Sequence, residues 1–363
     1  MTKHVVDRNM NVARISTDDI QWLSADATPL VLEGFAFRNR DGGFRRLPVN
    51  TPQCRYSHNV NLLANMSAGG ILRFRSDTPK MLVRATVRTH NNVGDIMSCG
   101  RCGFDLYAEG KYIASTHINF DLLKRTYSYT ALLFDCANPA KTMLSFELNF
   151  PLYAEVLNFE LGISADAHVD APFSRRFSRP LILYGTSIEQ GCCASRPGFG
   201  LCNILARRLD REVLNFGFAG SALGEGEIAR TLATIRDPAA YVLAYDANVN
   251  TKRLESTLCP FCTILRRQHP VTPIVTVSLL RFPGERLLHS GGDSDSVERA
   301  ERTRIHRKNL AYWKKNIHFL DGFVVLGDNF AEYFVDGCHP NDNGMLLYAE
   351  SLANELQQEF LMH

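Results

Sequence analysis

The sequence predicts an α/β protein built from an antiparallel β-sandwich followed by a three-layer α/β/α domain with a parallel sheet. Three observations support this fold class. Short strand-like runs with turn signals fill the first half, strand-like and helix-like runs alternate in the second half, and 363 residues suffice for two domains. The pattern of strand-like and helix-like runs changes near residue 175, so we expect domains at 1–175 and 176–363.

The first half contains runs rich in β-branched and aromatic residues, at 70–75, 81–87 and 144–148. Several of these runs alternate apolar with polar residues, a period typical of strands buried on one face. Long helical periodicity is absent from this half of the sequence. An antiparallel β-sandwich therefore fits it best.

The second half alternates apolar runs with helix-like stretches. The expected strands are 181–184, 213–216, 241–245, 273–280 and 317–320, and the expected helices are 198–209, 225–236, 254–268, 297–316 and 341 to about 360. Apolar strands separated by helices indicate a parallel sheet that is buried on both faces. Ligands bind such sheets at the carboxyl ends of the strands, so the residues after each run are the candidates for a site.

The overall composition excludes several classes of function. Forty Lys and Arg residues nearly balance 38 Asp and Glu, which leaves a net charge of +2 and predicts no nucleic-acid partner. No stretch reaches the roughly 18 consecutive apolar residues that a membrane helix requires. Residues 1–18 are charged and lack an apolar signal region. We therefore expect a cytoplasmic protein whose ten cysteines are free thiols.

A serine and a histidine occupy positions suited to nucleophilic catalysis. Ser187 follows the 181–184 strand through Gly185, and this turn into a helix would expose its hydroxyl at the sheet edge. Near the C-terminus, Asp336 precedes His339 by three residues, a spacing at which a carboxylate can fix the imidazole tautomer. Together these residues predict a serine nucleophile with a histidine base.

Two further strand ends offer donors for a developing negative charge. The stretch after 213–216 contains Gly217 and Gly220, and glycines allow backbone N–H groups to approach a ligand closely. The stretch after 241–245 contains Asn248 and Asn250, whose side-chain amides can donate to the same oxyanion. The spacing alone does not choose within either pair.

This order of serine, glycine, asparagine and Asp-x-x-His resembles the SGNH, or GDSL-like, hydrolase superfamily. The stretch 185–188, Gly-Thr-Ser-Ile, is similar to the Gly-Asp-Ser-Leu block, and 336–340 matches the key positions of the terminal Asp-x-x-His block. The stretch 103–107, Gly-Phe-Asp-Leu-Tyr, is similar to the Gly-x-Asp-Leu-Tyr signature of a β-sandwich that precedes one subfamily. In that subfamily Gly-Thr-Ser-Ile-x-Gln-Gly is the usual nucleophile block.

The resemblance implies a flavodoxin-like catalytic domain and assigns roles to individual residues. Ser187 would be the nucleophile, His339 the general base and Asp336 the residue that orients His339. The oxyanion hole would consist of the backbone N–H groups of Ser187 and Gly220 and the side-chain amide of Asn250. Gly217 and Asn248 remain alternatives for the last two positions.

These roles predict a serine esterase that hydrolyses small O-acyl esters through an acyl-enzyme. The resemblance favours acetyl esters on a carbohydrate, so the expected partner is a small-molecule or saccharide acyl ester. The chemistry requires no metal and no organic cofactor. One alternative is an acyltransferase of specialised metabolism that uses the same residues, and a more distant one is a carbohydrate-binding protein without catalysis. The sequence leaves the oligomeric state open.

Three residues near the motifs are candidate substrate contacts, namely Thr186, Asp105 and Tyr107. Thr186 precedes the nucleophile directly. Asp105 and Tyr107 belong to the Gly-x-Asp-Leu-Tyr stretch, where they either face the cleft and select the substrate or hold a β-turn together. The sequence favours neither role for this pair.

The cysteine pairs have simpler interpretations. Cys99 and Cys102 form one C-x-x-C pair, and Cys259 and Cys262 form another. More than a hundred residues separate the two pairs, whereas zinc sites of this type need pairs close together, so we expect ordinary thiols. The adjacent residues 192 and 193, both cysteines near the nucleophile, are expected to serve packing rather than to tune the pocket.

Overall fold

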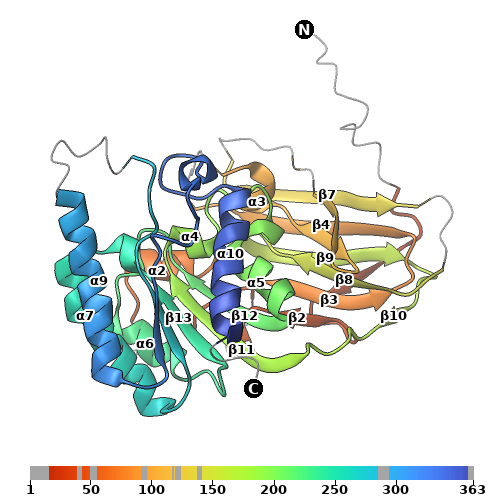
Figure 1. The fold of residues 1–363 in the computed structure, drawn as a ribbon. Helices are drawn as coiled ribbons and strands as arrows, with labels where there is room; N and C mark the ends of the chain where they lie inside the picture. The colour runs from red at the N-terminus through yellow and green to blue at the C-terminus, as the bar shows by residue number, and fades with distance from the viewer. Residues whose placement is uncertain are drawn as a thin grey trace, which may run out of the picture.

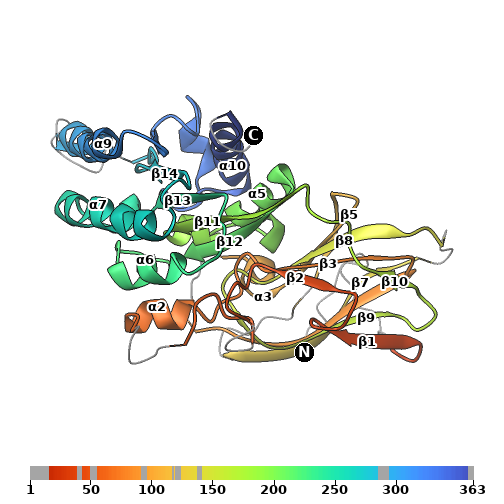
Figure 2. The same ribbon diagram turned by 90° about the horizontal axis from the view of Figure 1, so that it is seen from below.

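The computed structural model describes residues 16–38, 43–49, 55–90, 96–116, 118, 124–136, 141–284 and 294–358. The N-terminal half forms antiparallel sheets and the C-terminal half a parallel sheet between helices, which confirms the predicted fold class. The two parts lie side by side in Figures 1 and 2. The division at residue 175 stays a prediction.

The N-terminal half contains two antiparallel sheets. The first has the order β1 (Ile20–Ser24), β9 (Glu155–Ser164), β4 (Lys80–Arg88) and β7 (Thr126–Asp135). The second has the order β10 (Val169–Asp170), β3 (Ile71–Ser76), β8 (Leu144–Asn149), β5 (Asp105–Ala108) and β6 (Lys111–Ser115), and β2 (Val31–Glu33) pairs with β3. Two short helices, α2 (His58–Leu63) and α3 (Ser98–Cys102), lie between the strands in the chain.

Period-two patterning explains how these sheets bury their inner faces. On β4, Met81, Val83, Ala85 and Val87 alternate along the strand, are at most 2% exposed, and belong to the apolar cluster of the sandwich. The aromatic rings of the same cluster pack edge-on and tilted at centroid distances of 5.0–5.9 Å around Phe150. Such pairs add to the stabilisation that area burial provides.

The C-terminal half is built on one five-stranded parallel sheet. Its order is β12 (Arg211–Gly217), β11 (Phe177–Gly185), β13 (Ala240–Ala244), β14 (Ile274–Val277) and β15 (Ile317–Leu320). Helices α5 (Leu201–Leu209) and α10 (Asp342–Leu356) pack on one face. Helices α6 (Gly226–Leu232), α7 (Thr251–Gln268) and α9 (Ser294–Trp313) cover the other, as Figure 2 shows.

Several short elements complete this half, namely α4 (Ser187–Gln190), η2 (Pro197–Phe199), η3 (Asp246–Asn248) and η4 (Phe330–Tyr333). The helix predicted at 198–209 begins only at Leu201, because η2 occupies the preceding residues with Pro197 at its first position. The strand predicted at 273–280 ends at Val277, where pairing with β15 stops.

The strand order places a topological switch point at the end of β11. The chain passes from β11 to β12 on one side and later to β13 on the other, so Gly185 lies opposite Gly217 and Ala244. The segments that follow these three strands therefore meet at one edge of the sheet. Open α/β sheets bind their ligands at such an edge.

Buried polar contacts join the sandwich to the parallel sheet. The guanidinium of Arg46 is fully buried and donates to the carbonyls of Met66 and Leu63 on one side and of Asn215 and Gly217 on the other. Burial lowers the pKa of Arg46 to about 9. These hydrogen bonds compensate the cost of burying a cation between the two parts.

A second junction involves Asp105 of β5. Its carboxylate has no exposed surface and accepts hydrogen bonds from Arg196, at 2.7 Å, from the Gly198 backbone N–H, at 2.8 Å, and from Asn149, at 2.7 Å. Burial raises the pKa of Asp105 despite these donors. The carboxylate thus fixes η2 and the preceding loop against the sandwich.

We predict that Asp105→Asn lowers the free energy of unfolding by about 1–3 kcal/mol, because it leaves buried donors without an ionised acceptor. Urea denaturation of both proteins measures the difference. Asp26→Asn is the matched control, since the Asp26 carboxylate is 68% exposed in its pair with Arg38 and should cost at most about 1 kcal/mol. Equal losses in the two variants would contradict the proposed importance of this junction.

Candidate active site

The strand-to-helix turn at the end of β11 determines the position of Ser187. Thr186 adopts an extended conformation and caps α4, and its hydroxyl accepts a hydrogen bond from the Ile188 N–H at 3.2 Å. The Glu189 carboxylate accepts from both the Thr186 N–H and the Thr186 hydroxyl at 2.7 Å, which completes a capping box. Ser187 therefore begins α4 at the sheet edge, and its side chain is half-buried.

Ser187, His339 and Asp336 form a hydrogen-bonded chain. The Ser187 Oγ lies 2.8 Å from the His339 Nε2, although the two residues are 152 positions apart. The His339 Nδ1 lies 2.6 Å from the Asp336 Oδ2, and the other Asp336 oxygen accepts from the His339 backbone N–H at 2.7 Å. Such a chain can move a proton from a hydroxyl to an imidazole whose tautomer a carboxylate fixes.

The charges around His339 shift several pKa values. Burial disfavours the charged imidazole, but hydrogen bonding and charge from Cys192, and then from Asp336, raise the pKa of His339 to about 9. Partial burial likewise opposes ionisation of Asp336, yet its bonds to His339 lower its pKa. The pKa of Cys192 is lowered to about 5 by its contact with the Cys193 thiol. Burial opposes this shift, and His339 adds to it.

The two glycines after β12 lie in different surroundings. The Gly217 N–H donates to the Asn215 Oδ1 at 2.8 Å, and a Cβ on Gly217 would come within 2.3 Å of the Gln190 backbone nitrogen. Gly217 is therefore a point of close approach between β12 and α4. Gly220 has a φ of 60°, and a Cβ there would meet nothing within 4 Å.

The two asparagines after β13 also differ. The Asn248 Nδ2 lies 3.3 Å from the Phe218 carbonyl and 3.2 Å from the Ala222 carbonyl, in the loop that contains Gly220. The Asn250 side chain is instead the N-cap of α7, where its oxygen accepts from the Arg253 N–H at 2.9 Å. The structure thus joins Asn248, rather than Asn250, to the loop after β12.

The three candidate substrate contacts are buried, and their polar groups are bonded to other residues of the chain. Thr186 is 2% exposed and its hydroxyl is bonded within the capping box. Asp105 has no exposed surface, and the Tyr107 hydroxyl, in a side chain 6% exposed, lies 2.6 Å from Arg196. The polar groups of all three residues therefore have protein partners, and their contact with a substrate stays a prediction.

Two residues near the nucleophile were not singled out from the sequence. Glu189 is buried and bridges Thr186 to Tyr348 of α10, whose hydroxyl donates to it at 3.1 Å. Burial raises the pKa of Glu189. The Thr-x-x-Glu spacing of a capping box could have indicated Glu189. The contact with Tyr348 depends on the tertiary fold and has no sequence signal.

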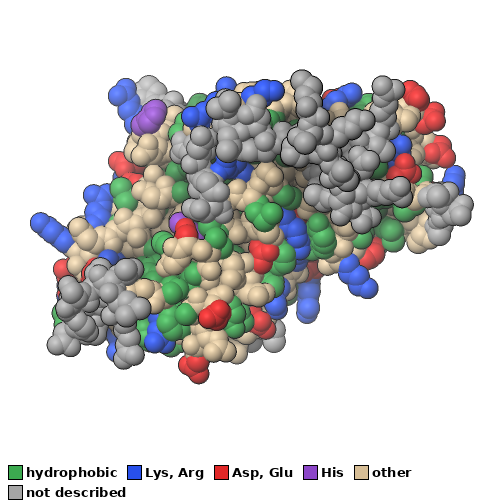
Figure 3. All heavy atoms as spheres, turned by 90° about the horizontal axis from the view of Figure 1, so that it is seen from above, with side chains coloured by type: hydrophobic (Ala, Val, Ile, Leu, Met, Phe, Trp, Pro, Cys, Tyr) green, Lys and Arg blue, Asp and Glu red, His purple; other side chains and the backbone are tan. Residues whose placement is uncertain are grey.

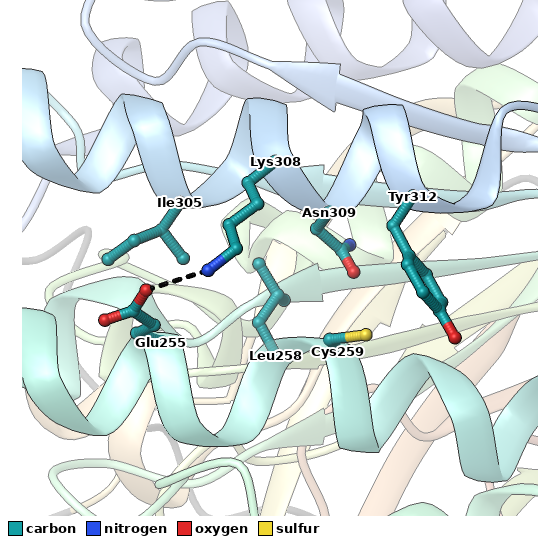
Figure 4. Close-up of a pocket in the computed structure, with 7 residues that line it drawn as sticks. All are labelled: Glu255, Leu258, Cys259, Ile305, Lys308, Asn309 and Tyr312. Carbon is teal, nitrogen blue, oxygen red and sulfur yellow. Dashed lines mark hydrogen bonds and ion pairs between the residues drawn. The ribbon is translucent and has the colours of Figure 1, made fainter.

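The cysteine pairs with C-x-x-C spacing are not bonded to each other. Cys99, Cys102, Cys259 and Cys262 are all free, in α3 and α7. Cys259 instead lines a cavity of about 140 Å³ between α7 and α9, together with Leu258 and Tyr312 (Figure 4). This cavity includes none of the predicted site residues.

No helix in the described ranges has the length and apolar character required to cross a bilayer. On the face drawn in Figure 3, Lys and Arg side chains are interspersed with acidic and hydrophobic ones.

Two family models match the chain, and together they cover both halves. The GDSL-like lipase/acylhydrolase family matches residues 178–357. The GxDLY family, the N-terminus of SGNH-hydrolase-type esterases, matches residues 20–169. A search among curated proteins gave no match.

Solved structures with similar folds extend over nearly the whole chain. A protein from Bacteroides ovatus described as a GDSL-like lipase is 26% identical, with a TM-score of 0.81 over 93% of this chain and 97% of that one. The salicylyl-acyltransferase SsfX3 of a tetracycline biosynthetic pathway is 20% identical, with a TM-score of 0.74 over 94% and 98%. A family two carbohydrate esterase from Cellvibrio japonicus is 14% identical, with a TM-score of 0.57 over 93% and 97%.

Proposed function

The chain belongs to the SGNH, or GDSL-like, hydrolase superfamily, and on this premise we propose a serine esterase whose nucleophile is Ser187. His339 is the general base and Asp336 orients it. The observation that carries this proposal is the chain of short hydrogen bonds, 2.8 Å from Ser187 to His339 and 2.6 Å from His339 to Asp336. This arrangement satisfies the geometric requirement for an activated nucleophile.

The reaction proceeds in two acyl-transfer steps. His339 Nε2 takes the hydroxyl proton while the Ser187 Oγ bonds to the ester carbonyl carbon. The tetrahedral intermediate collapses, the bond to the alcohol oxygen breaks, and the alcohol leaves with the proton from His339. Water then attacks the acyl-enzyme with His339 again as the base, which releases the acid and restores Ser187.

The oxyanion hole draws its donors from three strand ends. We assign the backbone N–H of Ser187 and that of Gly220, because the N–H of Gly217 already has a partner in Asn215. For the side-chain donor we assign Asn250, because the Asn248 amide already donates to the carbonyls of Phe218 and Ala222, whereas the α7 cap uses only the oxygen of Asn250. Donors held in place before the reaction stabilise the developing charge.

The proposed substrate is a small O-acyl ester, specifically an acetyl ester on a carbohydrate. Its support comes from the fold shared with the carbohydrate esterase of Cellvibrio japonicus, which aligns over 93% of this chain. The chemistry of Ser187 itself requires only an ester carbonyl within reach of its Oγ.

An acyltransferase is the second candidate, because the fold of SsfX3 aligns over 94% of this chain. The acyl-enzyme would be the same, and an acceptor alcohol would replace water in the second step. The ratio of ester product to free acid, measured with and without an added acceptor alcohol, distinguishes transfer from hydrolysis.

We predict that Ser187→Ala and His339→Ala each lower the turnover of para-nitrophenyl acetate by roughly 10⁴- to 10⁶-fold, because either change removes the activated nucleophile. The double variant should be little worse than the single ones, since these residues act as a unit. Butyrate and octanoate esters assayed in parallel report the size of the acyl pocket. Ser187→Ala with wild-type turnover would refute the proposed nucleophile.

Replacing the two asparagines identifies the side-chain donor of the oxyanion hole. Asn250→Ala should lower kcat by about 10²–10³-fold, because one donor to the oxyanion is lost, and should also cost about 1 kcal/mol of stability through loss of the α7 cap. Asn248→Ala is the matched control and should leave kcat within a few-fold of the wild type, because its amide donates to protein carbonyls. Steady-state kinetics and thermal unfolding of both variants measure these effects, and the reverse pattern of kcat would assign Asn248.

The pH dependence of kcat/KM should reflect the raised pKa of His339. The base accepts a proton only when neutral, so kcat/KM should increase with pH until about 9, where the pKa of His339 lies. Cys192→Ala removes the main group that raises this pKa and should move the profile to lower pH. Cys338→Ala is the control, and identical profiles for wild type and Cys192→Ala would contradict the prediction.

A further inference from the structure

Two adjacent cysteines lie beside His339, and neither makes or breaks a bond in the proposed hydrolysis. Neither Cys192 nor Cys193 is in a disulfide, and they are only 3% and 7% exposed. Their sulfur atoms are 3.8 Å apart, and one ring nitrogen of His339 joins them in a group whose ligand atoms all lie within 4.8 Å of one another. Two thiols and an imidazole form a donor set typical of zinc sites.

The backbone after α4 brings the two sulfur atoms together. Gly191 ends α4 with a φ of 106°, and the Cys192 N–H donates to the Ser187 carbonyl at 2.8 Å. Cys193 has a φ of 65°, a conformation that is uncommon for residues other than glycine. Along an extended strand, neighbouring side chains point to opposite sides, whereas this turn places both thiols next to His339.

The separation of the two sulfur atoms fits a tetrahedral metal centre. Zinc–sulfur bonds of about 2.3 Å at tetrahedral angles place two sulfur ligands about 3.8 Å apart, the separation of the Cys192 and Cys193 sulfur atoms. The His339 Nδ1 is already bonded to Asp336 at 2.6 Å. A carboxylate on the far nitrogen is the usual support of a metal-bound histidine, and it leaves Nε2 as the ligand atom.

We propose that Cys192, Cys193 and His339 bind a soft divalent cation such as Zn²⁺ or Cd²⁺, and that the bound cation blocks catalysis. The two sulfur atoms bind as thiolates and His339 binds through an unprotonated Nε2, so binding releases the protons that these three ligand atoms carry and involves no change of oxidation state. The Nε2 lone pair that accepts the Ser187 proton becomes the bond to the metal. The site itself depends only on the three ligands, whereas its inhibitory effect rests on the proposed role of His339.

Direct binding is tested on the full chain, reduced and then freed of reductant. Equilibrium dialysis against Zn²⁺ should give one tightly bound ion per chain, and Cd²⁺ should produce a thiolate charge-transfer band in the ultraviolet. Cys192→Ala and Cys193→Ala should each weaken Zn²⁺ binding by at least about 100-fold. Cys136→Ala removes an exposed thiol beyond β7 and should bind as the wild type does.

Inhibition is measured on the same proteins with para-nitrophenyl acetate. Zn²⁺ should inhibit the wild type and Cys136→Ala over the concentration range in which it binds, and a chelator should restore activity. The residual activity of Cys193→Ala should resist the same Zn²⁺ concentrations. Ser187→Ala should still bind one Zn²⁺, which separates the metal site from the esterase proposal.

Distinct outcomes overturn the two proposals. Absence of the Cd²⁺ band in the wild type, or equal Zn²⁺ affinity in wild type and both folded cysteine variants, refutes the metal site. One bound Zn²⁺ that leaves turnover unchanged refutes the inhibitory effect. Wild-type turnover in Ser187→Ala refutes the esterase assignment and leaves the binding result intact. Thermal unfolding verifies that each cysteine variant is folded.

Discussion

The buried carboxylate of Glu189 is the contact on which the geometry of the site depends. It holds the Thr186 N–H and hydroxyl at 2.7 Å and receives the Tyr348 hydroxyl from α10. A Cβ on Gly185 would come within 2.4 Å of the Glu189 side chain, so only glycine lets the turn close over this carboxylate. A buried carboxylate is costly unless donors surround it, and here the donors are the groups that begin and flank α4. The position of Ser187 therefore depends on the hydrogen bonds that the Glu189 carboxylate accepts.

The same region connects two segments that are far apart in the sequence. Asp342, at the start of α10, accepts hydrogen bonds from the Ser195 N–H at 2.8 Å and from the Ser195 hydroxyl at 2.6 Å. Since His339 lies three residues before Asp342, this contact joins the loop after the nucleophile to the loop of the histidine. The sandwich supports that first loop from the other side through Asp105 and Arg196. Contacts from both halves of the chain thus hold Ser187 and His339 at their separation.

Local patterns predicted the fold and much of the strand-end cluster, whereas long-range contacts decided the details. Apolar runs marked the strands, and the rule that parallel strands end at one edge brought Ser187 and Gly220 to the same side. The choice between Asn248 and Asn250 depends on which amide already donates to carbonyls of the loop after β12, and two nearby asparagines offer nearly the same local signal. Asp105 was open to either role, because its partner Arg196 is 91 positions away. Side-chain partners at such separations leave no periodic trace in the sequence.

The nucleophile turn also explains why a metal-binding donor set can coexist with hydrolysis at one histidine. Catalysis needs an imidazole whose Nδ1 is fixed by a carboxylate and whose Nε2 carries a free lone pair. A zinc ligand needs the same two features. What separates the two functions is the group that Nε2 faces, and here it faces the Ser187 hydroxyl while two thiols lie within 4.8 Å of the imidazole. The proposed esterase and the proposed metal site therefore exclude each other at one atom, so the cation would act as a competitor of the Ser187 proton.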